Sequence, residues 1–289
     1  MSRFTNAMVL LGIGVLTTIF SCKKDDPIIH VDPGINFASG TGLINADISV
    51  PIYTPIKIKL TAVKGSTPLK YIKVEVDGIQ LAPSDFDING VDAPANPALL
   101  FNQDKEGVTN TYEFDPSTEP DTILYEFTIA DDNDSLVVNS ISVIFTAIPA
   151  TERAKGLIVY NFTGPRQAGV DLFNSKIVSG NDPNATIRDY GVVDPMSNGT
   201  WVKKFTPRNG SIIKDPPAGL SFSEISYVED IIYLFDNGSN DVGTTDTKVL
   251  AKGDFFIVKN GTAYFAISID NLTFTANDNL DNYEIAIKR

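Results

Sequence analysis

The sequence is poor in the side chains that most often build reactive centres. Its 289 residues include one Cys and one His. A single Cys excludes an intramolecular disulfide and a Cys-cluster metal site, and a single His excludes a pair of His ligands within one chain. A Ser-His-Asp or Cys-His catalytic site is excluded as well, because the predicted domains contain neither the base nor the thiol. We therefore expect no enzyme and no cofactor.

Basic side chains are also scarce. The chain has 23 Lys and Arg residues against 36 Asp and Glu residues, a formal net charge of −13. Such a surface repels phosphate, so nucleic acid is not an expected partner. Hydrophobic residues make up 43% of the chain, which is enough for a packed core, and the length suits one large or two ordinary domains.

The N-terminal segment has the pattern of an export signal. Arg3 is the only charged residue before position 22, and the run from Ala7 to Phe20 is apolar apart from two threonines. A positive start followed by a short apolar run predicts a signal peptide over 1–21. The run is shorter than the roughly 20 residues that span a bilayer, and we expect no transmembrane helix after it.

A lipidation motif ends this segment. Ile19-Phe20-Ser21-Cys22 resembles the lipobox of bacterial lipoproteins. The resemblance implies cleavage before Cys22 and acylation of its sulfur and its new amino terminus, with chains such as palmitate. Two or more acyl chains anchor a protein stably where one does not. The alternative is a core-type Cys that happens to follow an ordinary signal.

The next residues carry a charged tag and a tether. Lys23-Lys24-Asp25-Asp26 is similar to the tag that sends some Gram-negative lipoproteins to the outer face of the outer membrane; the alternative is the solvated start of a tether. Residues 22–40 contain several Pro and Gly residues and little periodicity, which predicts a flexible tether. His30 lies there, and we expect no catalytic or metal role for it.

Residues 41–148 have the pattern of a β-sandwich. Apolar and charged residues alternate over 56–60 and 72–76, and the second run ends at Asp77-Gly78, a hairpin signal. A polar turn at 131–134 precedes a long strand over 137–145. The spacing of strands and turns predicts an immunoglobulin-like (Ig-like) sandwich, although no Cys pair supports the antibody type.

After a polar linker over 149–155, residues 156–289 predict a second antiparallel β domain, so that the fold class is all-β. Asp254–Lys259, Asn260-Gly261 and Thr262–Ile269 form the clearest hairpin, and 283–287 alternates as a terminal strand. One short helix is expected from Ser221, whose capping box precedes apolar residues at spacings of three and four up to Asn237. Two short strands are the alternative.

Several segments of this half occur in a recognisable order: Val170–Val178, a strand with Trp201, Gly253–Lys259 and the closing strand at Tyr283. Together they resemble the C-terminal β domains of uncharacterised surface lipoproteins and are distantly similar to HmuY-type haem-binding lipoproteins. In that family paired His residues hold the haem iron. This half contains no His, so the similarity implies the fold and surface residence but not haem binding.

Candidate ligand sites are few. Calcium requires several oxygen ligands on a turn, and the candidates are Asp131, Asp132 and Asp134. Two further candidate clusters are Asp236, Asn240, Asp241 and Asp246, and Asn277, Asp278 and Asp281. Asp- and Asn-rich turns also occur without metal, so solvated turn residues are the alternative.

Sugar binding would use exposed aromatic rings. Trp201 is the only Trp. It is a candidate ligand-stacking residue, but a lone Trp in a strand is more often a packing residue of the core or of a domain interface. Tyr190, Tyr227 and Tyr233 have the same ambiguity, with a stronger expectation of core positions.

These observations predict a membrane-anchored, non-enzymatic lipoprotein on the cell surface. Its tandem β domains would bind a glycan or protein ligand in adhesion. One alternative is a structural or accessory subunit of an outer-membrane complex. Another is a carboxylate-dependent glycan hydrolase, since such enzymes need only two suitably spaced acids; no spacing in the sequence singles out a pair.

Overall fold

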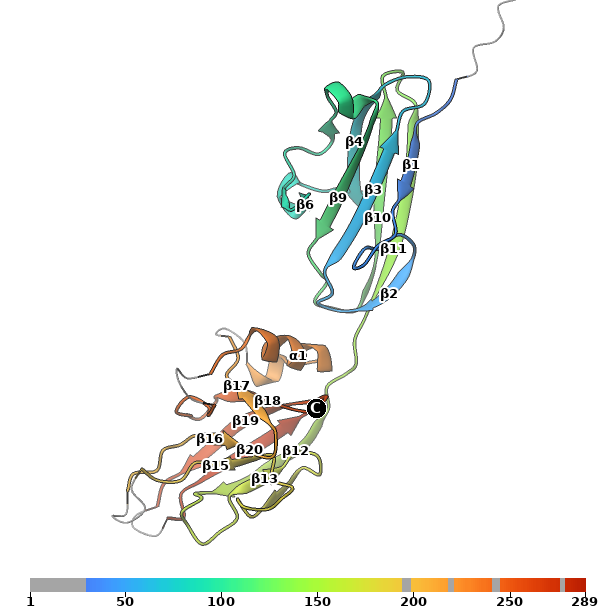
Figure 1. Cartoon of the computed structure of the whole chain (residues 1–289). Coiled ribbons are helices and arrows are strands. Elements are labelled where there is room, and N and C mark those ends of the chain that lie inside the picture. The colour runs from blue at the N-terminus through green and yellow to red at the C-terminus, as the bar shows by residue number, and fades with distance from the viewer. Residues whose placement is uncertain (1–29, 194–198, 218–220, 241–244, 276–278) are drawn as a thin grey trace, which may run out of the picture.

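The computed structural model describes residues 30–193, 199–217, 221–240, 245–275 and 279–289. The predicted signal peptide, Cys22 and the charged tag lie outside these residues. Strands are the main regular elements of the described chain, and nearly all of them pair antiparallel (Figure 1), which confirms the expected all-β fold class. No helix of the described residues is long and apolar enough to cross a membrane.

The first half of the chain forms two facing sheets. Sheet I has the strand order β1 (Gly34–Phe37), β3 (Ile56–Val63), β9 (Gly107–Phe114), β6 (Phe86–Ile88) and β7 (Val91–Asp92). Sheet II has the order β2 (Ile48–Pro51), β11 (Leu136–Thr146), β10 (Asp121–Asp131), β4 (Leu69–Val76) and β5 (Ile79–Gln80), and β8 (Ala98–Leu99) also pairs with β4. Two 3-10 turns, Pro83–Asp85 and Asn102–Lys105, lie between strands.

This arrangement is an Ig-like sandwich. The predicted alternation is observed in β3, whose burial pattern alternates along its whole length, because every second side chain faces the opposing sheet. Phe127 is central to the core, with its ring 5.0 Å from that of Tyr112 and 5.5 Å from that of Phe37. Asp77 and Gly78 both have positive φ, at 51° and 75°, as a type I′ hairpin requires.

The start of the sandwich corrects the predicted tether. Strand β1 lies inside the range 22–40 and pairs with β3 from Gly34↔Val63 to Phe37↔Leu60. Phe37 is buried in the core, so these residues belong to the folded domain rather than to a flexible segment. The strand has only four residues and directly follows Pro33, which is too short for a periodic signal in the sequence.

The second half also contains two sheets. Sheet III has the order β12 (Glu152–Tyr160), β20 (Asn282–Lys288), β19 (Ala263–Thr273), β18 (Phe255–Asn260) and β17 (Ile212–Lys214). Sheet IV has the order β14 (Lys176–Val178), β13 (Gly169–Asp171), β15 (Ile187–Asp189) and β16 (Phe205–Pro207). The expected hairpin is the β18–β19 pair, and the expected terminal strand is β20.

Strand β12 shortens the predicted linker. It begins at Glu152, so the second half of the range 149–155 is paired strand. The rest of that range is also held in place: the Ala150 N–H donates to the Ser226 carbonyl at 2.8 Å, and Pro149 forms a β-bridge with Tyr227. Strand β12 lies at the edge of sheet III, where charged side chains on an exposed face are tolerated. Its composition is therefore as polar as that of a linker, which is why the sequence predicted a linker here.

The predicted helix forms, but it begins later than its capping signal. Ser221 and Glu224 bracket a 3-10 turn, Phe222–Glu224, and α1 (Val228–Asn237) follows. The buried side chains Ile231, Leu234 and Phe235 pack on sheet III against Phe255, Ile257 and Ala266. Strand β18 is therefore covered on both faces, which explains its uninterrupted apolar run. Helix α1 lies at the end of the second domain that faces the first (Figure 1).

Candidate functional site

Trp201 is largely buried in the second domain. Its side chain is only 5% exposed, and its ring lies 4.5 Å from that of Tyr283 and 5.7 Å from that of Phe274. The indole N–H donates to Asp189 Oδ2 at 2.8 Å. These contacts and the low exposure correspond to the packing alternative, and Trp201 also lines a small hollow of about 240 Å³ together with Lys203 and Phe274.

Asp189, the partner of Trp201, is a fully buried carboxylate. Its Oδ1 accepts the N–H groups of Phe162 and Gly191, both at 2.8 Å. Burial raises the pKa of Asp189 to about 6, although these hydrogen bonds and the one from Trp201 act in the opposite direction. The sequence offers no signal for it, because an Asp at a strand end is usually solvated.

The side chains of the three calcium candidates are each engaged by other protein groups. Asp131 accepts hydrogen bonds from the N–H groups of Asn133 and Ser135, both at 2.9 Å, and from the hydroxyl of Thr67. Asp132 pairs with Lys105, and Asp134 pairs with Lys70. Among the described residues no three His, Cys, Asp or Glu side chains are grouped so that they could hold a metal ion.

Asp131 has a structural role instead. It closes the turn between β10 and β11, and His30 Nε2 lies 3.6 Å from Asp131 Oδ2 and 2.8 Å from Ser135 Oγ. These contacts connect the chain before β1 to the same turn. In the two other candidate clusters, Asp241, Asn277 and Asp278 lie outside the described residues.

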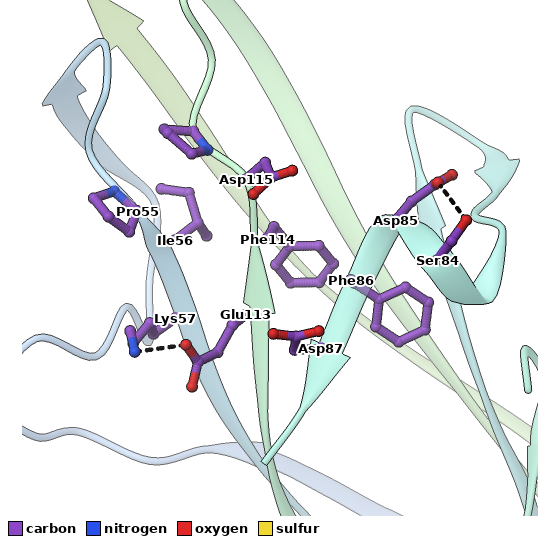
Figure 2. A pocket seen from close by; sticks show the side chains of 11 residues that line it. Pro55, Ile56, Lys57, Ser84, Asp85, Phe86, Asp87, Glu113, Phe114 and Asp115 are labelled. Carbon is purple, nitrogen blue, oxygen red and sulfur yellow. Dashed lines mark hydrogen bonds and ion pairs between the residues drawn. The ribbon is translucent and has the colours of Figure 1, made fainter. Parts of the chain in front are cut away.

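An acidic groove opens on sheet I (Figure 2). It has a volume of about 240 Å³ and is lined by residues of β3, β6 and β9. Asp87 and Glu113 are direct cross-strand neighbours in it, so the fold brings two carboxylates together here. Glu113 is paired with Lys57 at 2.6 Å.

Two further hollows lie between the two domains, around a pair of stacked tyrosines. Tyr53, in the loop between β2 and β3, stacks on Tyr233 of α1 with ring centroids 4.4 Å apart and an angle of 14°. The Tyr53 hydroxyl donates to Asp230 Oδ1 at 2.9 Å. Partial burial, together with this carboxylate, raises the pKa of Tyr53 above its ordinary range.

The first turn of α1 connects the domains at several further points. Asp230 Oδ2 accepts the N–H groups of Ser226 and Tyr227, both at 2.8 Å, so this carboxylate caps the helix and also binds Tyr53. Glu229 Oε2 accepts the N–H of Ile148 at 2.9 Å. Glu119, from the first domain, hydrogen-bonds to Tyr227 and raises its pKa. Together these contacts hold the tyrosine stack between the domains.

Tyr53 has an unusual backbone. Its φ is +63°, in the left-handed region that costs an ordinary residue roughly 1–2 kcal/mol. Its N–H donates to the Ser117 carbonyl at 2.9 Å, which fixes the loop, and the strained turn points the ring at α1. Neither feature is visible in the local sequence, which is why Tyr53 was not predicted as a site residue.

The hollows on the two sides of the stack differ in character. One has a volume of about 180 Å³ and a polar rim that includes Thr118, Glu119, Ser221 and Glu224. The other has a volume of about 450 Å³, and its lining includes Pro51, Ile52, Ile232 and Asp236. Tyr53 and Tyr233 line both. We refer to the two hollows and the tyrosine stack as the interdomain cleft.

The exposure of two tyrosines differs from expectation. Tyr233 is 40% exposed and Tyr190 is 47% exposed, whereas the sequence favoured core positions for both. Tyr233 occupies the helix face opposite to the buried side chains of α1. Tyr190 lies next to β15, outside the residues that line the interdomain cleft.

Comparisons with known proteins give only distant similarities. No family model matches the chain, and no curated protein matches it. The chain is similar to a fibronectin(III)-like module of Clostridium thermocellum CbhA, with 15% identity, a TM-score of 0.25, and coverage of 39% of this chain and 97% of the module.

Two further similar structures span both domains. The Ig1-2 module of the Drosophila receptor tyrosine phosphatase DLAR is 9% identical, with a TM-score of 0.26, and covers 88% of this chain and 96% of its own. The major pilin BcpA of Bacillus cereus is 10% identical, with a TM-score of 0.29, and covers 90% of this chain and 67% of its own. Similarities this distant carry no information about function.

Proposed function

We propose that this protein is a lipid-anchored surface module that binds a glycan, without turnover, in the interdomain cleft. The observation that carries the proposal is the Tyr53–Tyr233 stack, which lies between a polar and an apolar hollow open to solvent. Pyranose rings have apolar faces that pack on aromatic and aliphatic side chains, and hydroxyl groups that donate to carboxylates. The cleft offers both kinds of contact side by side.

The charge of the cleft restricts the class of glycan. Glu119, Glu224 and Asp230 line the polar hollow, and Glu229 and Asp236 line the apolar one. No Lys or Arg is among the described residues that line either hollow. Sulfated or uronic-acid polymers would be repelled, so the expected ligands are neutral or amino-substituted saccharides.

The predicted anchor supports a surface location. The lipobox at Cys22 and the following charged tag are features of exported lipoproteins, and folded structure begins only a few residues after them. Proteolysis of intact cells tests this placement. Rapid loss of the protein, with a periplasmic control intact, supports display on the outer face, and protection until the outer membrane is opened contradicts it.

Binding is tested with a glycan panel that includes neutral, amino-substituted and acidic members. We expect binding to neutral or amino sugars, and at least a tenfold loss of affinity in Tyr233→Ala. The matched control is Tyr190→Ala, which removes a similarly exposed ring of the same domain away from the cleft and is expected to bind normally. Equal losses in both variants, or binding confined to acidic polymers, would contradict the proposal.

A further inference from the structure

Two arginines are neighbours on the outer face of sheet IV. Arg188 belongs to β15, where Ile187 and Asp189 are buried and face the core, so Arg188 faces outward because side chains alternate along a strand. Arg208 directly follows β16, which lies beside β15 (Figure 1). Its N–H donates to the Thr186 carbonyl at 2.9 Å and continues the ladder by one residue. The two arginines are therefore diagonal neighbours, within reach of long side chains.

The guanidinium of Arg188 is held in one orientation. Its Cζ lies 4.0 Å from the centroid of the Phe162 ring, and its Nη1 donates to Asn181 Oδ1 at 3.1 Å. The loop that carries Asn181 packs closely on the same ring, since a Cβ at Gly180 would lie 2.4 Å from a carbon of Phe162. A planar guanidinium that is already positioned loses less conformational entropy when it binds a ligand.

The backbone beside Arg208 is also fixed. Asn209 Nδ2 donates to the carbonyls of Pro183 and Ala185, at 2.8 and 2.7 Å. The Nε atoms of Arg208 and Arg188 are both buried, and neither has a hydrogen-bond partner within the described chain. Buried donors without an acceptor are uncommon in folded proteins. Both arginines are therefore well positioned, and the described chain leaves part of their donor capacity unused.

The two positive charges lack a counter-charge on this face. Burial and the positive charge of Arg208 lower the pKa of Arg188, and the carboxylate that acts in the opposite direction is Asp189, which faces the core. Within the described part of the chain neither arginine forms an ion pair, although the whole protein has a net charge of −13. Two like charges held close together disfavour the folded state, and an anion bound between them would remove this repulsion.

We propose that Arg188 and Arg208 together bind one phosphate or sulfate group. Each guanidinium donates pairs of parallel hydrogen bonds, and a tetrahedral oxyanion has enough oxygens to accept from both. A polyanion is not the expected ligand, because the net charge of the protein repels it, whereas a single anionic group in direct contact is little affected beyond the Debye length of about 8 Å. The site lies outside the interdomain cleft, and the proposal is independent of glycan binding there.

Calorimetric titration of the full-length chain in detergent tests the site. The probes are inorganic phosphate, sulfate, glucose 6-phosphate and glucose 6-sulfate. We expect the wild type to bind, and Arg188→Gln and Arg208→Gln each to bind about tenfold more weakly, because each loses hydrogen bonds to a charged acceptor. The control is Arg153→Gln, an exposed position of β12 in the other sheet of this domain, which should bind normally. Absence of binding by the wild type, or an equal loss in Arg153→Gln, would overturn the proposal.

Thermal melts give a second readout that also reports whether each variant folds. A ligand that binds only the folded state raises the melting temperature, so phosphate at constant ionic strength should raise that of the wild type and of Arg153→Gln. The double variant Arg188→Gln/Arg208→Gln should show a smaller rise. Phosphate also stabilises proteins in general, and the comparison between variants removes this effect. An equal rise in all three proteins would overturn the proposal.

The same titrations identify the source and the geometry of the anion. Tighter binding of the two sugar esters than of the inorganic ions would support an esterified ligand, and equal binding would support a free ion. Arg208→Lys keeps the positive charge but not the planar group, and we expect it to bind more weakly than the wild type and more tightly than Arg208→Gln. Glucuronate, whose carboxylate has only two oxygens, should bind weakly; tighter binding of glucuronate than of every phosphate and sulfate probe would overturn the proposal.

Discussion

The contact between Tyr53 and α1 gives the sharpest quantitative prediction. Tyr53→Phe removes only the hydroxyl that donates to Asp230 at 2.9 Å. A hydrogen bond to a charged acceptor contributes about 1.5–3 kcal/mol, and partial exposure reduces this to about 1 kcal/mol. Tyr53→Ala also removes the stack on Tyr233, which contributes about 1 kcal/mol more. We expect Tyr53→Gly to lose less than Tyr53→Ala, because glycine relieves the positive φ.

The single Trp makes this prediction measurable. Trp201 is buried in the second domain, so its fluorescence during urea denaturation follows the unfolding of that domain. Tyr53 belongs to the first domain, and its substitution shifts the Trp201 transition only if the domains stabilise each other. We expect the urea midpoint of the Trp201 transition to decrease from Tyr53→Phe to Tyr53→Gly to Tyr53→Ala. Tyr53→Ala should lower the free energy of unfolding by about 2 kcal/mol.

The control is Val91→Ala, an exposed change in β7 of the first domain, which should leave the Trp201 transition in place. An unchanged Trp201 transition in Tyr53→Ala would contradict this prediction, because the interdomain contacts would then contribute nothing to the stability of the second domain.

Three further predictions concern individual carboxylates of the two domains. The raised pKa of Asp189, about 6, lies above the ordinary value of 3.8, so its contribution to stability is fully present below about pH 4 and is lost as the pH rises to 6. The unfolding free energy of wild type relative to Asp189→Asn should therefore fall by about 3 kcal/mol over this range, and a flat difference would contradict it. Asp131→Ala should destabilise the first domain by about 2 kcal/mol in thermal melts, because it leaves two turn N–H groups without their acceptor; a change below half that value would refute this. Calcium titration should produce no shift in melting temperature, because the carboxylates of Asp131, Asp132 and Asp134 have protein partners, and a clear upward shift would contradict the structure.

The strand architecture was predictable because its signal is local. The alternation in β3 and β4, and the apolar runs of β18 and β19, specify strands without reference to the rest of the chain. Strand β1 escaped detection because four residues next to a proline carry little periodicity. The start of α1 was misplaced because Ser221 and Glu224 do form a capping box, but around a 3-10 turn.

The candidate site was less predictable because it depends on contacts between distant segments. Tyr53 and Tyr233 lie in different domains, and their stacking requires both the left-handed turn at Tyr53 and the docking of α1. Trp201 and Asp131 were candidates because of their residue types. Trp201 is buried and packs in the second domain, and Asp131 accepts hydrogen bonds that close a turn. A sequence pattern specifies local structure more readily than it specifies which polar side chains are buried or hydrogen-bonded by distant segments.

We propose that the interdomain cleft binds a neutral or amino-substituted saccharide at the cell surface. The most direct measurement is the binding of a fluorescent saccharide from the panel to cells that display equal amounts of wild type, Tyr233→Ala or Tyr190→Ala. We expect equal binding by wild type and Tyr190→Ala and little binding by Tyr233→Ala. Equal binding by all three would contradict it.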